Sequence, residues 1–376
     1  MKAWNTTGAL GLVIFFITGC QSDAILPDAV SGSVPEATAF TFEKVTTTEI
    51  WAGSYDGYLD ATGTNAQFFR PYDIDADLQG TIYIADTENH RIRKISPEGE
   101  VTTFAGSTQG FADGNGGTAR FNYPTGLDVD ALGNVFVADN GNHRIRKISP
   151  KGIVTTISGN KLGYQDGSSQ FARFSFPEDL AVDGEGNIYV TDQHRIRKLT
   201  LTDPKLGSYT VSTLAGGSSS GFADGPSSSA RFNFPIGITI GPSGSVYIAD
   251  TGNHRIRVMP PSGATVSTLA GTGPGYADGD ASNAQFRRPL NLAFRESALY
   301  VADSDNHKIR LIMDGQVSTL DTQPSTHIAE TEPPSIGDNP NFYEFYLCHP
   351  TGVYPDPDGA VYVSAYCNSR IWRILP

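Results

Sequence analysis

The sequence predicts an all-β fold, a six-bladed β-propeller, and three observations support this fold class. The 376 residues include 41 Gly, 23 Pro, 16 Tyr and 20 Phe, a composition that is typical of many short strands joined by turns. One segment recurs as five close copies and one degenerate copy, at 83–95, 136–148, 189–199, 247–259, 300–312 and 362–374. A proline precedes each copy, and successive prolines are 53 to 61 residues apart. A unit of four short strands repeated at this period indicates a propeller.

Residues 1–19 are expected to be a signal peptide. Lys2 supplies a positive charge, and an apolar run follows from Ala9 to Ile17 that is too short to span a bilayer as a helix. The run ends in Ile17-Thr18-Gly19-Cys20, which resembles the lipobox of bacterial lipoproteins. This resemblance implies that Cys20 carries a lipid.

A tether is expected over residues 20–44, because this stretch is polar and contains proline. In the lipoproteins that the lipobox resembles, a residue other than Asp after the cysteine favours sorting to the outer membrane, and in this chain that residue is Gln21. We find no other segment long and apolar enough to cross a membrane. The sequence therefore predicts a protein of the bacterial cell envelope, in the outer membrane, with the lipid as its anchor.

Residues 45–376 form the predicted propeller, with four strands in each unit. In the second unit, strands are expected at 126–129, 135–138, 143–148 and 153–157, with turn dipeptides such as Asn140-Gly141 between them. The sixth unit stops after its third strand, whereas residues 45–53 match the fourth strand of the other units. The N-terminal strand is therefore expected to close the last blade, which removes two exposed sheet edges.

The pattern Asp-x-x-Asn-His-Arg-Ile-Arg in the recurrent segment resembles the NHL repeat, and the resemblance covers nearly all of residues 45–376. It implies the propeller fold. The family includes RNA binders, protein-interaction modules and propellers allied to lactonases and lyases, so it implies no single function. The repeated Asp and His residues recur once per unit and are therefore spread around a ring. We interpret them as structural residues that cap turns and tie neighbouring strands.

One connection departs from the repeat. Residues 321–349 lack the Asp-Gly motif of the other connections, and we expect them on the face that holds the loops between blades. We interpret carboxylates and aromatic residues of this region as a candidate ligand face: Glu330, Glu332, Phe342, Tyr343, Phe345, Tyr346 and Tyr366. The alternative is an insertion that only packs its aromatic residues on the sixth blade.

Two cysteines, Cys348 and Cys367, lie in the sixth unit. In an oxidising envelope such a pair is a disulfide candidate, and two free thiols are the alternative. Residues 348–371 resemble one blade of the peptidylglycine amidating lyase propeller, which implies a disulfide and matches Tyr366 to a catalytic tyrosine. Such lyases place zinc-binding histidines just after the opening prolines. In this chain those positions hold Tyr72, Thr125, Glu178, Ile236, Leu290 and Thr351.

The axis of the propeller offers a second candidate site. Two residues after the opening prolines, alternate units carry Asp73, Asp179 and Asn291, and Glu178 lies beside one of them. Lactonase-type propellers bind one divalent cation in the channel through carboxylates and amides, so these four residues are a hypothetical site for Ca²⁺ or another divalent cation. The alternative is that they cap the inner strands, since no base or nucleophile accompanies them.

The net charge of −13 disfavours nucleic acid as a ligand. The sequence therefore favours a lipid-anchored, monomeric propeller that binds a protein, peptide or glycan on its loop face, without catalytic residues or a cofactor. A metal-dependent lactonase-like or lyase-like enzyme that uses the central channel is the alternative.

Overall fold

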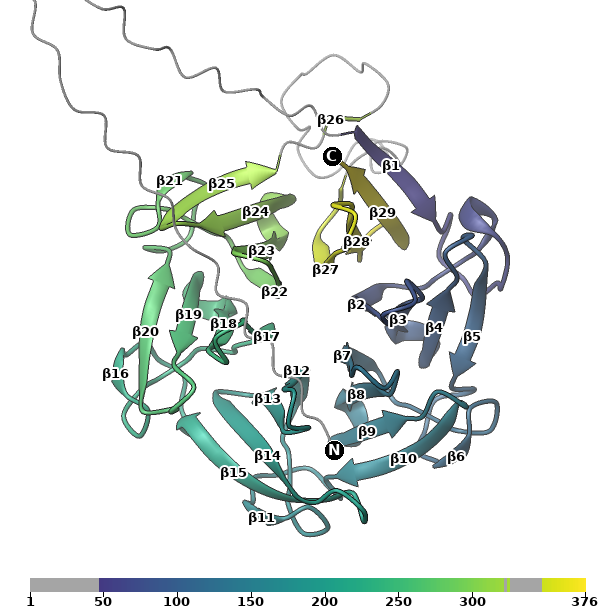
Figure 1. Cartoon of the computed structure of the whole chain (residues 1–376), viewed down its shortest axis with the longest axis horizontal. Helices are drawn as coiled ribbons and strands as arrows, with labels where there is room; N and C mark the ends of the chain where they lie inside the picture. The colour runs from purple at the N-terminus through teal and green to yellow at the C-terminus, as the bar shows by residue number, and fades with distance from the viewer. Residues whose placement is uncertain (1–46, 321–322, 325–346) are drawn as a thin grey trace, which may run out of the picture. The chain divides into compact units, whose positions relative to one another are not determined.

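Six sheets stand in a ring around a central axis, and each sheet is one blade of a propeller (Figure 1). The computed structural model describes residues 47–320, 323–324 and 347–376. Among these residues, no helix has the length and apolar character needed to cross a membrane. The expected signal peptide, tether and lipidated Cys20 lie outside the described residues. The predicted all-β class and the six-bladed architecture are confirmed.

Each blade has four antiparallel strands, numbered along the chain and named below from the inner strand to the outer one. Blade 1 consists of β2 (Pro71–Ala76), β3 (Ile82–Asp86), β4 (Arg91–Ile95) and β5 (Val101–Ala105). Blade 2 consists of β7 (Pro124–Val129), β8 (Val135–Asp139), β9 (Arg144–Ile148) and β10 (Ile153–Ser158). Blade 3 consists of β12 (Pro177–Val182), β13 (Ile188–Asp192), β14 (Arg195–Asp203) and β15 (Ser208–Gly216).

The second half of the ring repeats this order. Blade 4 consists of β17 (Ile238–Ile240), β18 (Val246–Asp250), β19 (Arg255–Met259) and β20 (Thr265–Ala270). Blade 5 consists of β22 (Pro289–Arg295), β23 (Ala298–Asp303), β24 (Lys308–Met313) and β25 (Gln316–Leu320). Blade 6 consists of β27 (Pro350–Pro355), β28 (Val361–Ala365), β29 (Arg370–Leu375) and β1 (Thr47–Ala52).

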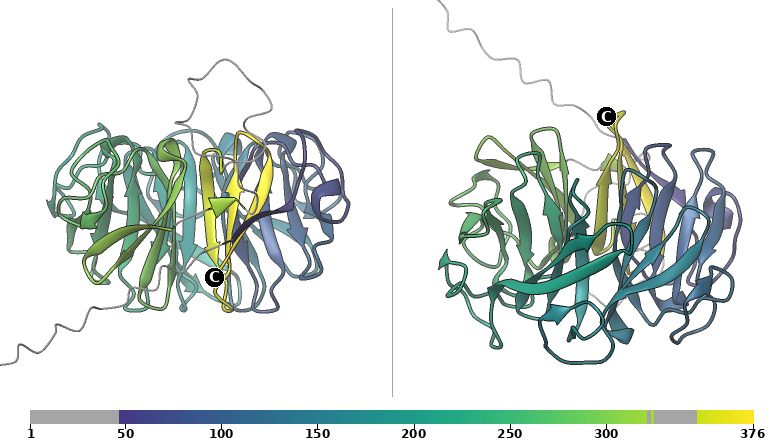
Figure 2. Two further views of the ribbon diagram at one scale, coloured as in Figure 1. Left: turned by 90° about the horizontal axis from the view of Figure 1, so that it is seen from above. Right: turned by 60° about the horizontal axis from the view of Figure 1, so that its bottom comes forward.

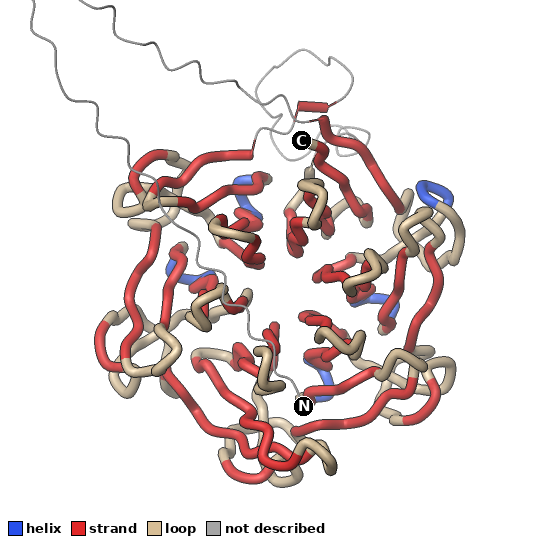
Figure 3. Tube along the Cα trace, viewed as in Figure 1, coloured by secondary structure: helices blue, strands red, loops and turns tan. Residues whose placement is uncertain are grey.

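Short elements complete the blades. Every blade except blade 1 has a two-residue fifth strand on its outer edge: β6 (Gly114–Asn115), β11 (Gly167–Ser168), β16 (Gly225–Pro226), β21 (Gly279–Asp280) and β26 (Gln323–Pro324). The 3₁₀ helices, blue in Figure 3, are η1 (Gly63–Asn65), η2 (Thr87–Asn89), η3 (Asn140–Asn142), η4 (Thr251–Asn253) and η5 (Ser304–Asn306). The sequence did not predict the fifth strands, because two residues carry no periodic signal.

The strands run between two faces of the ring (Figure 2). One of them, which we call the loop face, holds the loops that enter each blade and the turns that follow each second strand. Turns and loops are tied together by side-chain amides: Asn89 Nδ2 donates to the Gly57 carbonyl at 2.7 Å, and Asn142 Nδ2 donates to the Gly110 carbonyl at 2.8 Å. Both kinds of connection therefore lie on the same face of the ring.

The first and last strands close the ring. β1 pairs antiparallel with β29, in a register that places Thr48 opposite Ile374 and Ile50 opposite Trp372. The ring of Trp51 packs against Tyr362 of β28 with centroids 4.8 Å apart. The prediction that the N-terminal strand completes blade 6 is confirmed.

Buried phenylalanines of the connecting loops plug the seams between blades: Phe68, Phe121, Phe174, Phe232 and Phe286 are all fully buried. Phe121, for example, packs with Ala85 and Ile92 of blade 1 and with Val137 of blade 2. Each plug contacts two blades, and every seam, including the one between blades 5 and 6, holds its own cluster of buried apolar residues.

A buried arginine ties each of blades 1 to 5 to its incoming loop. In blade 2, Arg146 is fully buried and binds Asp139 at 2.6 Å and Asp113 of the loop at 2.6 Å. The equivalent arginines are Arg93, Arg197, Arg257 and Arg310. This arrangement explains why the Asp and Arg residues of the repeat recur, and it supports the structural interpretation of the Asp residues.

Candidate functional site

Six residues, each immediately before the proline that opens an inner strand, surround the axis on the loop face. We call them the mouth ring: Arg70, Tyr123, Phe176, Phe234, Arg288 and His349. Three consecutive blades contribute aromatic side chains, with exposed fractions of 39% for Tyr123, 44% for Phe176 and 55% for Phe234. The arginines on either side of them are also exposed. The ring thus presents an arc of aromatic side chains between two guanidinium groups.

Histidines of the preceding blade hold the backbone of the mouth ring. Four members of the ring have φ between 44° and 50°, a left-handed conformation that costs a non-glycine residue roughly 1–2 kcal/mol. Each of the four donates its backbone N–H to a histidine Nδ1 at 3.0–3.2 Å; the pairs are Tyr123–His90, Phe234–His194, Arg288–His254 and His349–His307. The sequence predicted that these histidines tie neighbouring strands, whereas they link neighbouring blades.

These histidine bonds make the loop face sensitive to pH. Burial lowers the pKa of His254 below its ordinary value of 6.5, so the folded protein binds the proton less tightly than the unfolded chain does. Protonation turns Nδ1 into a donor and breaks the bond to the Arg288 N–H. The stability from this bond is therefore present above about pH 6.5 and is lost as the pH falls through the folded-state pKa.

We expect His254→Asn to lower the free energy of unfolding by about 1 kcal/mol at pH 8, the usual contribution of one hydrogen bond, and by less at pH 5. Asn tolerates the left-handed backbone that residue 254 adopts. Urea unfolding at a series of pH values measures the difference. A difference that stays constant from pH 8 to pH 5 would show that the imidazole does not titrate in this role.

Tyrosines of blades 1 and 6 lie beside the arginines of the mouth ring. The Arg70 guanidinium is 5.2 Å from the centroid of the Tyr366 ring, and its Nη1 lies 3.4 Å from Tyr366 Oη and 3.4 Å from Glu88 Oε1. Tyr366 in turn packs against Tyr72 with ring centroids 6.3 Å apart. Burial, followed by the charge of Glu178, holds the pKa of Tyr72 well above its usual range, so its hydroxyl remains protonated.

The candidate metal residues Asp73, Asp179 and Asn291 converge on the axis, and the structure shows what their side chains bind. The Asp73 carboxylate accepts the Leu127 N–H of the next blade at 2.8 Å, and Asp179 accepts the Ile238 N–H at 2.9 Å. Asn291 Oδ1 accepts the Val353 N–H at 3.2 Å, while its Nδ2 donates to Asp73 Oδ1 at 2.9 Å. Each group therefore cross-links its blade to the following one.

Glycines alternate with these side chains around the axis. At the position equivalent to Asp73, blade 2 has Gly126, and a Cβ there would lie 2.4 Å from the Cα of Asp179. Gly237 and Gly352 approach Asn291 and Asp73 in the same way, within 2.7 Å and 2.9 Å of their Cα atoms. Since no side chain fits at these distances, a polar side chain in one blade requires a glycine in the blade before it.

Carboxyl groups line the channel in two layers. Burial raises the pKa of Asp73 to about 7 and holds that of Asp179 well above its usual range. The second layer contains Asp75 and Asp128. Burial is the main cause that raises the pKa of Asp75 well above its usual range, and the charge of Asp128 and a hydrogen bond between the two carboxyl groups raise it further. These four residues line a cavity of about 230 Å³. The channel is therefore a buried layer of cross-linking carboxyl groups whose pKa values all lie above their usual range.

The fourth candidate ligand, Glu178, lies toward the loop face. Burial raises the pKa of its carboxyl group to about 7, and its backbone carbonyl accepts a hydrogen bond from Thr125 Oγ1 at 2.6 Å. Its carboxyl group binds Asn140, so it too has a partner in the protein.

The donor set on the axis fits hydrogen-bonded cross-links better than a calcium site. Ca²⁺ takes six to eight oxygen ligands. Asp73 and Asp179 supply carboxylates that already accept backbone N–H groups, and Asn291 turns its amide nitrogen, not its oxygen, toward Asp73. Among the residues that the structure describes, no group of three His, Cys, Asp or Glu side chains has the geometry of a metal site.

The candidate ligand face from the sequence is only partly visible. Glu330, Glu332, Phe342, Tyr343, Phe345 and Tyr346 lie outside the described residues. Tyr366, the remaining residue of that candidate ligand face, does lie on the loop face, beside Arg70. The mouth ring was missed, although aligning the residue before each opening proline would have revealed three aromatic residues in consecutive units.

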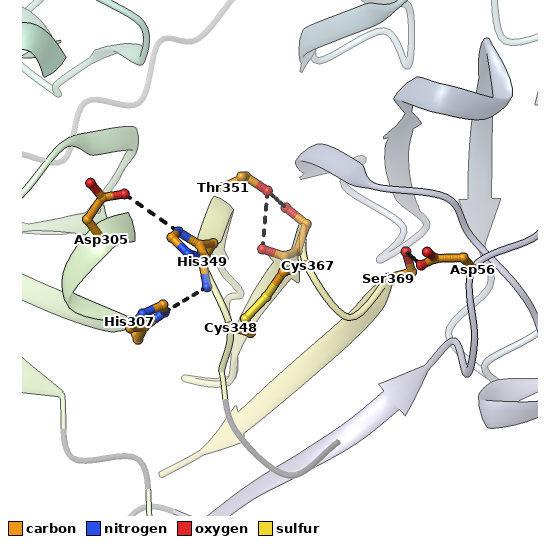
Figure 4. Close-up of a disulfide and its surroundings, with 9 residues drawn as sticks. Asp56, Asp305, His307, Cys348, His349, Thr351, Cys367 and Ser369 are labelled. Carbon is orange, nitrogen blue, oxygen red and sulfur yellow. Dashed lines mark hydrogen bonds and ion pairs between the residues drawn. A yellow bond between two sulfur atoms is a disulfide. The ribbon is translucent and has the colours of Figure 1, made fainter. Parts of the chain in front are cut away.

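A disulfide joins Cys348 and Cys367 on the loop face, with their Cα atoms 5.7 Å apart (Figure 4). The predicted pairing is confirmed. It fixes the entrance to β27 next to His349, whose Nδ1 lies 3.6 Å from Asp305 of blade 5. The bond thus anchors the last member of the mouth ring.

Replacing both cysteines (Cys348→Ser with Cys367→Ser) is expected to lower the free energy of unfolding by roughly 3 kcal/mol, since the bond closes a loop with a sequence separation of 19. Guanidinium unfolding of the variant and of the oxidised protein gives the value. Non-reducing peptide mapping should recover the two cysteines in one linked pair. Recovery of both as alkylated free thiols would contradict the assignment.

Comparison with known proteins identifies the repeat. The family model "NHL repeat" matches residues 121–148 and 232–259, in blades 2 and 4. NHL repeat-containing protein 2 of Bos taurus is 29% identical over 315 residues, which cover 72% of this chain and 42% of that protein. The chain is an NHL-repeat β-propeller. Protein SUPPRESSOR OF QUENCHING 1 of Arabidopsis thaliana is 31% identical over 314 residues, which cover 75% of the chain and 29% of that protein. The NHL propeller thus spans less than half the length of these two relatives.

Solved structures share the fold of this NHL propeller. An auxiliary nutrient binding protein from Bacteroides ovatus superposes with a TM-score of 0.62 at 16% identity, covering 88% of this chain and 76% of that one. A gluconolactonase from Xanthomonas campestris superposes with a TM-score of 0.53 at 15% identity, covering 87% and 88%. At such low identities these likenesses establish the fold alone.

Proposed function

We propose that this NHL propeller is a non-catalytic binding module of the bacterial cell envelope, and that its ligand docks on the mouth ring. The observation that carries the proposal is the arc of Tyr123, Phe176 and Phe234, whose rings remain 39–55% exposed beside exposed arginines. Aromatic residues and arginine are enriched in binding surfaces. The channel carboxylates, by contrast, accept hydrogen bonds from neighbouring blades, which leaves no group placed as a free base or nucleophile among the described residues of the axis.

The cellular location is part of the proposal. The lipobox-like Ile17-Thr18-Gly19-Cys20 supports lipid attachment at Cys20 and retention in the envelope, with Gln21 favouring the outer membrane. The disulfide between Cys348 and Cys367 supports an oxidising compartment. The auxiliary nutrient binding protein from Bacteroides ovatus has the same fold, which supports a binding role.

Lipid anchoring is tested by Cys20→Ser. The variant should move from the detergent phase to the aqueous phase in a detergent partition experiment, because it loses the acyl chains that hold the protein in a bilayer. Unchanged partitioning would refute lipid attachment at this residue.

Ligand binding is tested with oligosaccharide and peptide arrays. Ligands that the native protein retains should be lost by the combined variant Tyr123→Ala, Phe176→Ala and Phe234→Ala. They should be kept by Phe171→Ala, whose ring has a similar exposed fraction of 58% but lies in a connecting loop. Equal losses in both variants, or no retained ligand, would refute binding at the mouth ring.

A metal-dependent lactonase-like or lyase-like enzyme remains the second candidate, because Asp73, Asp179 and Asn291 do converge on the axis. Metal analysis of the purified protein distinguishes the two functions. Stoichiometric metal that disappears when the three residues are replaced by alanine would replace the binding proposal with an enzymatic one.

A further inference from the structure

We propose that the ligand of the mouth ring is an acidic oligosaccharide, whose sugar rings pack on the aromatic arc and whose carboxylate lies between Arg70 and Arg288. This inference rests on the proposed function and adds the chemical class of the ligand. It follows from the order of residues around the ring, which is Arg70, Tyr123, Phe176, Phe234, Arg288 and His349.

The aromatic arc offers ring surfaces to a ligand that has apolar faces. Tyr123 and Phe234 each pack edge-on against a histidine, with ring centroids 4.7 Å and 4.3 Å apart. These contacts hold the rings in place without covering them, since the rings stay partly exposed. Rigid aromatic rings lose little conformational entropy on binding, and the C–H face of a pyranose ring is an apolar partner of matching size.

The other side of the ring carries the two guanidinium groups, with the carboxylates of Glu88 and Asp305 nearby. Arg288 forms no ion pair within residues 47–320, 323–324 and 347–376, and its charge acts on Tyr72 across blade 6. Arg70 interacts with Glu88 only at 3.4 Å, and both side chains are partly exposed. A planar guanidinium group binds a carboxylate through two parallel hydrogen bonds. The protonated hydroxyl of Tyr72 adds a neutral donor in the same region.

The backbone of the ring favours a saccharide over an extended peptide. The N–H groups of Tyr123, Phe234, Arg288 and His349 already donate to histidines. A peptide laid across the ring would therefore meet few free main-chain donors for its carbonyl groups. A saccharide needs ring faces and side-chain charges, and both are present.

The test is calorimetric titration of the full-length protein with trisaccharides of galacturonic, glucuronic and mannuronic acid, each compared with its methyl ester. The ester removes the negative charge and preserves the ring faces. We expect at least one acid to bind roughly tenfold more tightly than its ester. Failure of all three acids to bind, or equal binding of acid and ester, would overturn the inference.

Variants locate the contacts. Arg288→Met should reduce the affinity for the acid to that for the ester and leave the affinity for the ester unchanged, whereas Arg231→Met, an exposed arginine of a connecting loop, should change neither. Phe234→Ala should weaken acid and ester alike by roughly tenfold, and Phe171→Ala should weaken neither. Equal effects of Arg288→Met and Arg231→Met would contradict the assignment of the carboxylate. Melting temperatures of all four variants exclude unfolding as the cause.

The same data separate this inference from the proposed function. If a neutral saccharide or a peptide binds, and Phe234→Ala but not Phe171→Ala abolishes that binding, the mouth ring is a binding site and the acidic saccharide is wrong. If no ligand responds to Phe234→Ala, the proposed function fails as well.

Discussion

Deletion of residues 47–52 is expected to destabilise the entire propeller by about 5 kcal/mol or more, and not to affect blade 6 alone. The deletion removes β1, so the edge of β29 loses its partner and the contact between Trp51 and Tyr362 disappears. Removing a well-packed aromatic side chain alone costs about 3–5 kcal/mol. Because a cluster of buried apolar residues joins the two blades at every seam, the ring is expected to unfold as one unit, with a melting temperature lower by about 10 °C or more.

The control for this deletion is removal of residues 21–40, the expected tether. Scanning calorimetry of both truncations gives the comparison. The tether deletion should melt like the native protein. If the two truncations have the same melting temperature, closure of the ring by β1 contributes nothing to stability.

Arg146→Met is expected to cost about 3–5 kcal/mol, among the largest effects of any single substitution in this protein. The arginine is fully buried, and its removal leaves Asp139, also fully buried, without its charge partner. Two carbonyls, of Arg120 and Ala112, lose their donors as well. Urea unfolding of the variant measures the loss.

Two further variants show whether the unpaired charge is the cause. The other partner of Arg146 is Asp113, whose side chain is 43% exposed. Asp113→Asn should therefore cost no more than about 1 kcal/mol. The double variant Arg146→Met with Asp139→Asn should be more stable than Arg146→Met alone, because the buried charge is gone. If the double variant is the less stable of the two, lost packing rather than uncompensated charge explains the effect.

The fold was largely predictable from the sequence because each blade repeats the same physical requirements. Every unit needs an opening proline, and five of the six also carry an Asp and an Arg that pair in the interior and a phenylalanine at the seam, so these residues recur at near-constant spacing. Closure of the ring was visible because the sixth unit lacks one strand that the N-terminal segment supplies.

The site was less predictable, because the relevant contacts join different blades. The histidine bonds connect residues more than 30 positions apart, for example His90 with Tyr123. A positive φ at residue 123 is also unexpected before Pro124, since that context favours extended backbone. Asp73, Asp179 and Asn291 were located correctly on the axis, but only the structure shows that they bind neighbouring backbone groups.

Because glycine alternates with Asp or Asn around the axis, the propeller needs an even number of blades. The ring looks sixfold in its strands, yet its innermost layer repeats every second blade, so the structural unit at the axis is a pair of blades. If one blade were lost or duplicated, either two glycines or two polar side chains would become neighbours at the axis. Two glycines would leave a gap. Two side chains would not fit, because a Cβ at the glycine position would already lie too close to the backbone of Asp179 or Asn291. Propellers of this type are therefore expected to grow, shrink or be recombined two blades at a time.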